Sequence, residues 1–224
     1  MTIYENLIDA AQEGDIDEVK RFIAEGADVN MCDGHGRTPL MKASSWGHLE
    51  IARMLIEKGA AVDSTDVFGC TALIDASMVG HEEIVGLLLE KGADTTYRDD
   101  EGSTALMIAS RKGKDGIVRL LLDMKKVSGL KDQYYNLAFF EACRKGFLDI
   151  VKLFIEKGVD VNAEHSLIAA AENGHCEIAK ILIGNGADIN ARGPLGATAL
   201  EAAMKNSHLK VIKLLEESGA KDKI

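Results

Sequence analysis

The sequence predicts an all-α protein made of seven short helical units stacked in a row, and three repeated markers indicate it. A glycine followed by Ala-Asp-Val-Asn or a close variant lies at Gly26, Gly59, Gly92, Gly158 and Gly186. A second marker lies at Gly14, Gly47, Gly80, Gly113, Gly146, Gly174 and Ser207. A third is alanine in every copy, at Ala10, Ala43, Ala76, Ala109, Ala142, Ala170 and Ala203. Similarity at a fixed interval is the mark of a repeat architecture.

The markers step by 33 residues, except for one step of 28 residues between Gly146 and Gly174. They divide the chain into units that together form one domain over residues 1–224. The unit boundaries are 1–30, 31–63, 64–96, 97–129, 130–162, 163–190 and 191–224.

Each complete unit is predicted to form two short helices and a turn, as residues 31–63 illustrate. Thr38 is a good N-cap residue, and Pro39 suits the first helical position. Gly47 ends the first helix, because glycine tolerates the left-handed backbone of a helix stop. Leu49, Ile51, Ala52, Leu55 and Ile56 then form the apolar stripe of a second helix. Turn residues at 33–36 predict a hairpin-like projection, here called a finger.

The combined motifs resemble the ankyrin repeat over essentially the whole chain. They are the period of 33 residues together with Thr38-Pro39-Leu40-Met41, Gly47-His48-Leu49-Glu50 and Gly26-Ala27-Asp28-Val29-Asn30. The resemblance implies an ankyrin-repeat solenoid of stacked helix-turn-helix units with short β-hairpin-like fingers. It also implies a concave binding face, made by the fingers and the exposed edge of the first helices.

Several units depart from the family pattern. The histidine that usually follows Thr-Pro-Leu is absent from all seven units, so we expect cohesion between repeats to depend more on packing. Units four and five lose their motifs near 124–129 and 137–140, which predicts a weak seam at 124–136. Unit six is short at 163–165, so its finger should be missing. Charged residues at Glu18, Arg21 and Glu216 indicate terminal units with polar outer faces, hence a nearly complete array.

Composition and motifs favour binding over catalysis. A net charge of −10 disfavours nucleic acid, and no apolar run is long enough to span a membrane. Four scattered cysteines without a secretory signal predict a cytoplasmic protein, and we expect no cofactor or metal. The His-x-Glu pattern of zinc deaminases occurs at His48, His81 and His175. No Pro-Cys-x-x-Cys follows, and all three lie at one repeat position, so we interpret them as structural.

The partner surface is predicted from the two residues before each helix–helix glycine and from the fingers. An apolar part comprises Trp46, Phe68, Met78 and Val79, with His35 beside it. A basic part comprises Arg111, Lys112, Arg144 and Lys145, beside Tyr134 and Tyr135. We therefore expect a monomer that binds a partner protein as scaffold, adaptor or inhibitor, and the basic part favours an acidic or phosphorylated segment of that partner.

Alternatives stay open at each of these residues. Trp46 could cover its own helix pair, the basic residues could be solvated surface, and the tyrosines could fill the space left by a missing threonine cap. A different class of function is a small-molecule-responsive or enzymatic protein with a site between repeats.

Overall fold

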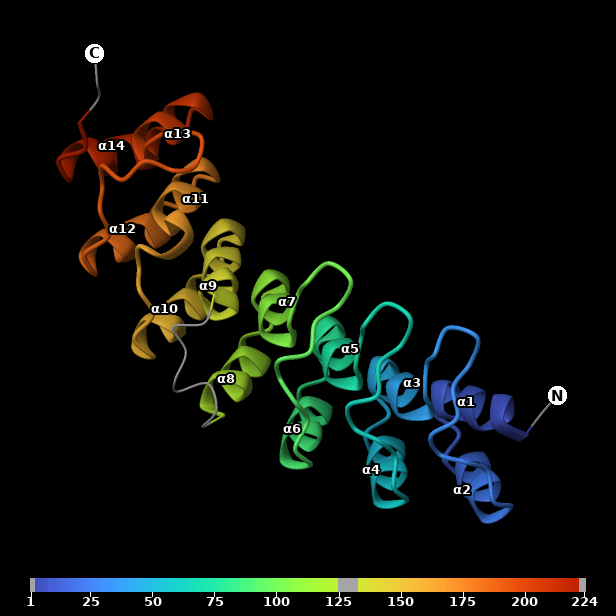
Figure 1. Ribbon diagram of the computed structural model, residues 1–224. Coiled ribbons are helices and arrows are strands. Elements are labelled where there is room, and N and C mark those ends of the chain that lie inside the picture. Colours follow the sequence, from blue (N-terminus) through green and yellow to red (C-terminus); the bar gives the residue numbers. More distant parts are fainter. Residues whose placement is uncertain (1–2, 125–132, 222–224) are drawn as a thin grey trace. The chain divides into compact units, whose positions relative to one another are not determined.

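A computed structural model describes residues 3–124 and 133–221 of the chain. The described residues form α-helices that come in pairs, joined by loops (Figure 1). The chain divides into two compact units, Met1–Ala109 and Ser110–Ile224. The helices are α1 Ile3–Glu13, α2 Ile16–Ala24, α3 Pro39–Trp46, α4 Leu49–Glu57, α5 Ala72–Val79, α6 Glu82–Glu90, α7 Ala105–Lys112, α8 Asp115–Asp123, α9 Gln133–Lys145, α10 Leu148–Glu156, α11 Ser166–Glu172, α12 Cys176–Gly184, α13 Ala199–Lys205 and α14 Leu209–Glu217, with a 3₁₀ turn, η2, at Ala163–His165.

Within the first unit, one helix of each pair packs on the equivalent helix of the next pair. Helices α1, α3 and α5 lie side by side, and α2, α4 and α6 pack behind them as a second row. Leu40, Leu73 and Leu55 are buried between the rows. Ala43 and Ala76 have no exposed surface, which fits the prediction that this alanine position lets helices approach closely.

The second unit repeats this two-row packing with larger side chains. Helices α9, α11 and α13 form one row, and α8, α10, α12 and α14 form the other. The rings of Phe139 and Phe154 are fully buried, with centroids 5.7 Å apart. The aromatic residues thus replace part of the leucine layer that fills the first unit.

Helix ends follow the predicted capping residues. The side chains of Thr38, Thr71 and Thr198 accept hydrogen bonds from the backbone three residues later. Gly47 and Gly80 end α3 and α5 with φ of 84° and 109°, a left-handed backbone that a side chain would strain. The predicted helix–turn–helix unit is therefore confirmed. Much of the predicted weak seam, at residues 125–132, lies outside the described residues.

Histidines at a different repeat position, directly after the helix–helix glycine or its equivalent, form hydrogen bonds between repeats that the sequence did not predict. The Nε2 atom of His48 donates to the carbonyl of Gln12 at 2.9 Å, and that of His81 donates to the carbonyl of Ser45 at 3.2 Å. In the second unit His175 and His208 make the equivalent bonds to the preceding repeats. The structural interpretation of His48, His81 and His175 is confirmed, because each bonds its own repeat to the one before it.

The fingers are tight five-residue turns, and none of the described residues forms a β-strand. In each turn the first residue donates a backbone bond to the carbonyl of the fifth, in the pairs Asp33 to Arg37, Asp66 to Cys70, Asp99 to Ser103 and Gly193 to Ala197, and the fourth residue donates to the carbonyl of the first. Neighbouring fingers are joined, because Val67 donates to the carbonyl of His35 and Asp100 to that of Phe68. Figure 1 shows these loops before α3, α5 and α7 side by side.

Unit six has no finger, as the sequence predicts. Its five missing residues equal the length of one finger turn, and the short η2 turn at Ala163–His165 stands in its place. Glu164 and His165 there have φ of 50° and 57°, in the left-handed region that non-glycine residues seldom occupy. The finger before α13, residues 193–197, consequently has no neighbouring finger in unit six.

Candidate protein-binding surface

The four predicted apolar contact residues of the first unit, Trp46, Phe68, Met78 and Val79, are all exposed and are here called the apolar face; Met31, Val67 and Tyr97 of this unit are exposed as well. The exposed fractions of the four residues of the apolar face are 58%, 54%, 38% and 46%, respectively. Trp46 and Val79 are the last residues of α3 and α5, each directly before the glycine that ends its helix. Phe68 lies at the tip of the finger before α5. Exposed apolar residues at equivalent positions of neighbouring repeats are typical of an interaction site.

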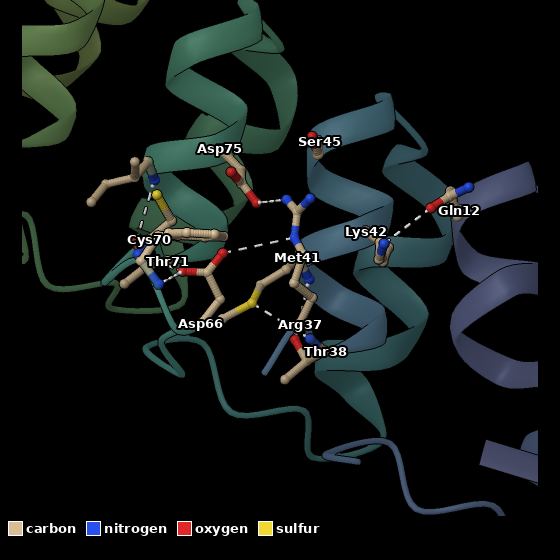
Figure 2. Close-up of polar contacts among 12 residues, drawn as sticks. Gln12, Arg37, Thr38, Met41, Lys42, Ser45, Asp66, Cys70, Thr71 and Asp75 are labelled. Carbon is tan, nitrogen blue, oxygen red and sulfur yellow. Dashed lines mark hydrogen bonds and ion pairs between the residues drawn. The ribbon is translucent and has the colours of Figure 1, made fainter. Parts of the chain in front are cut away.

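The finger at 33–37 is joined to the next repeat by ion pairs with two buried carboxylates (Figure 2). Arg37 donates from Nη2 to Asp75 on α5 at 2.6 Å, and its Nε atom lies 3.9 Å from Asp66 in the next finger. Burial raises the pKa of Asp75 despite the nearby guanidinium. Arg37 therefore ties two repeats together instead of pointing to a partner.

Cys70 is the last residue of the finger turn that begins at Asp66, and its thiol is unreactive. Burial, together with the negative charges of Asp75 and Asp66, raises the pKa of its thiol to about 12. Since the thiolate is the nucleophile, a thiol of this pKa is almost entirely unreactive at neutral pH. The cluster is thus a structural joint, and the sequence pattern alone did not reveal it.

The basic residues of the second unit are only partly available. Lys112 and Lys145 are exposed at the ends of α7 and α9. Arg144 is half-buried and donates to Glu141 from two nitrogens, at 2.7 and 3.2 Å. Arg111 is also half-buried and has interactions of its own. Because Glu141 neutralises part of this charge, the basic part of the predicted surface is a weaker site for anions than the sequence indicates.

The two tyrosines require a correction. They were expected beside the fingers, but both lie in the first turn of α9. Tyr135 is 7% exposed, and its ring stacks edge-on against Phe154 with centroids 5.1 Å apart. Burial also raises the pKa of its phenol. Tyr135 therefore fills the core where the threonine cap is missing, while Tyr134 is half-buried beside it. His35 is exposed at its finger.

A pocket in the second unit was not predicted. It has a volume of about 490 Å³ and lies among α9, α11, α13, η2 and the finger at 193–197. Its apolar lining includes Leu137, Phe140, Ile168 and Leu195. The signal in the sequence was the five-residue shortening of unit six, which predicted a missing finger but not what the gap would uncover.

Paired helices in two rows, joined by fingers and by hydrogen bonds between neighbours, define a helical-repeat protein. The chain belongs to the ankyrin repeat family, because the profile described as "Ankyrin repeats (3 copies)" matches residues 7–99, 92–165 and 164–223. None of the helices in the described ranges is long and apolar enough to cross a membrane.

Two similar proteins illustrate the relationship. "Putative ankyrin repeat protein YahD" of Escherichia coli strain K12 is 54% identical over 35 residues, which are 16% of this chain and only 17% of that protein. The crystal structure of the human ASB11 ankyrin repeat domain matches with a TM-score of 0.83 and 27% identity, over 97% of this chain and 99% of that one.

Proposed function

We propose that this chain is a protein–protein interaction module whose main contact is the apolar face of Trp46, Phe68, Met78 and Val79. Ankyrin repeats are generally modules of this kind. The observation that carries the proposal is the exposure of four large apolar side chains on repeats that are otherwise well packed. Leaving that much carbon in water is unfavourable, and a partner that covers it recovers the hydrophobic free energy.

The module acts as a scaffold, adaptor or inhibitor in this proposal, and not through catalysis. We propose a monomer in the cytoplasm, where reducing conditions suit its four free thiols. Lys112 and Lys145 would add contacts to an acidic or phosphorylated segment of the partner. These charges would adjust the rate of association more than the affinity, because they lie in solvent.

The test compares capture of partners from a lysate of the source cell by three forms of the chain. One is the natural chain, the second carries Trp46→Ala and Val79→Ser, and the third carries Leu209→Ser. Leu209 is 77% exposed on α14, so it is an apolar residue of similar exposure outside the apolar face. Circular dichroism confirms that all three are folded.

We expect a protein that the natural chain and the Leu209→Ser variant retain and the Trp46→Ala/Val79→Ser variant loses. Large aromatic residues such as Trp46 typically dominate interface energies, so the loss should be at least about tenfold in affinity. If every captured protein binds the three forms equally, the apolar face is not the contact surface and this proposal is wrong.

A further inference from the structure

The pocket of the second unit exists because unit six lacks a finger. In the first unit the fingers at 66–70 and 99–103 each hydrogen-bond to the preceding one, as Val67 does to His35. The finger at 193–197 has no such neighbour. The space that a finger of unit six would fill is open, and Leu137 and Phe140 of α9 line it together with this finger. Ile168 of α11 lines the pocket between them, and the space encloses about 490 Å³. Pockets of this size and apolar character typically bind ligands.

The wall made by the finger is fixed by its own contacts. Other fingers are held by an aspartate, such as Asp33, but the equivalent position here is Gly193. A side chain at Gly193 would press on Ile168, since a Cβ atom there would lie 3.2 Å from its Cδ1. Arg192 instead holds the turn by donating to the carbonyl of Gly196 and by pairing with Glu201. The pocket is thus formed before any ligand arrives.

The rim offers charges of both signs. Lys205 and Arg144 contribute cations, Arg144 being also bonded to Glu141, and Glu164 and Glu172 contribute carboxylates. A ligand that carries a single kind of charge would therefore meet groups of its own sign on the rim. A wholly apolar molecule would cover these groups without giving them hydrogen bonds, which is costly. A peptide main chain has both donors and acceptors and can satisfy both kinds of group.

Leu195 extends the apolar surface beyond the pocket. It is 98% exposed at the tip of the finger, although it also lines the mouth. A small molecule seated within the pocket would leave most of this side chain in water. A polypeptide that passes from the pocket over the finger would cover it. The exposed leucine therefore favours an occupant that extends past the mouth.

We propose that this pocket binds a segment of a partner polypeptide that inserts one bulky apolar side chain, aromatic or leucine-like, between uncharged neighbours. The segment's main chain would bond to the mixed charges of the rim, and its next residue would cover Leu195. The proposal rests on the function proposed above. It adds a second contact site, in the second unit, to the apolar face of the first.

The probe is a phage-displayed library of random peptides, selected on the immobilised full chain. Selected peptides are then synthesised, and their affinity is measured by fluorescence anisotropy for the natural chain and four variants. Leu195→Asp and Ile168→Lys alter the pocket, Leu209→Asp is the matched exposed leucine outside it, and Trp46→Ala alters the apolar face. Leu195 is so exposed that its replacement should not unfold the chain, whatever Ile168→Lys does.

We expect enriched peptides that share one bulky apolar residue, and whose affinity falls by about tenfold or more with Leu195→Asp. Leu209→Asp and Trp46→Ala should leave that affinity unchanged. Peptides that lose affinity only with Trp46→Ala would overturn the pocket while supporting the apolar face. Recovery of no pocket-dependent peptide, alongside binding of free indole that Ile168→Lys abolishes, would also overturn it in favour of a small-molecule site.

Discussion

Arg37 shows how one residue links two repeats. The finger turn directs its guanidinium toward α5, because Asp33 accepts backbone hydrogen bonds from both His35 and Arg37. Its partner Asp75 is 7% exposed, so the carboxylate has little access to water. Its counterion is Arg37, with Asp66 close by. The pair therefore joins the finger at 33–37 to α5 of the next repeat.

Arg37→Met should lower the free energy of unfolding by about 3 kcal/mol at pH 7, since it leaves a buried carboxylate without its cation. The value is at the low end for such pairs because the Arg37 side chain is 26% exposed. Urea unfolding measures the loss. Arg53→Met, at an exposed arginine of α4, is the matched control and should change stability little.

The same variant should depend on pH in a defined direction. Burial raises the pKa of Asp75, and removal of Arg37 takes away a charge that lowers it. The native variant therefore holds the Asp75 proton more tightly than the unfolded chain does. The deficit is complete at neutral pH and shrinks as pH falls through the raised pKa, because the Asp75 carboxyl is then neutral in the folded variant and needs no counterion. A deficit that stays constant over the whole acidic range in which both proteins remain folded would contradict this account.

At the scale of elements, the sequence predicted the helices well and the joints between them poorly. Period, caps and glycines act within one unit, so Thr38, Pro39 and Gly47 placed α3 correctly. The histidine bonds join atoms 31 to 36 residues apart, and their acceptors are backbone carbonyls that any residue has. No residue pattern marks such an acceptor. The sequence left two interpretations of Tyr135 open, exposed contact or space-filling, because the ring of Phe154 that settles its burial lies on another helix.

Unit five is an informative exception among these elements. Phe147 stands where units two, three, six and seven have histidine and unit four has Lys114, and it packs on Gly113 as His81 packs on Gly47. A phenyl ring therefore fits the position but cannot donate a hydrogen bond. This difference lies just beyond the seam that the sequence predicted at 124–136.

His81→Phe should lower the free energy of unfolding by about 1 kcal/mol, the usual net worth of one hydrogen bond. The variant keeps the contact with Gly47, as Phe147 shows for Gly113, and loses the bond to the carbonyl of Ser45. Urea unfolding measures the difference, with Glu82→Gln at the exposed next residue as control. Unchanged stability would mean that the ring's packing, and not its hydrogen bond, joins the repeats.

At the scale of the whole molecule, interactions within each compact unit are local in sequence. Units two, three, six and seven each bond to the preceding repeat through a histidine, and neighbouring repeats also bond through pairs such as Asn30 with Ala61 and Asn162 with Asp188. The stability of a repeat array is roughly a sum over units and neighbouring contacts. Damage in one compact unit should therefore stay largely within it.

Leu55→Ala tests this locality. Leu55 is fully buried in α4, so its truncation should cost about 2–5 kcal/mol. Hydrogen exchange read by mass spectrometry should show faster exchange in α3 to α6, while α11 to α14 keep their protection, because local opening exposes only the weakened repeats. Leu209→Ala, at an exposed leucine, should change exchange nowhere beyond its own helix end. Equal loss of protection in α4 and α12 would instead mean that all the repeats unfold as one cooperative body.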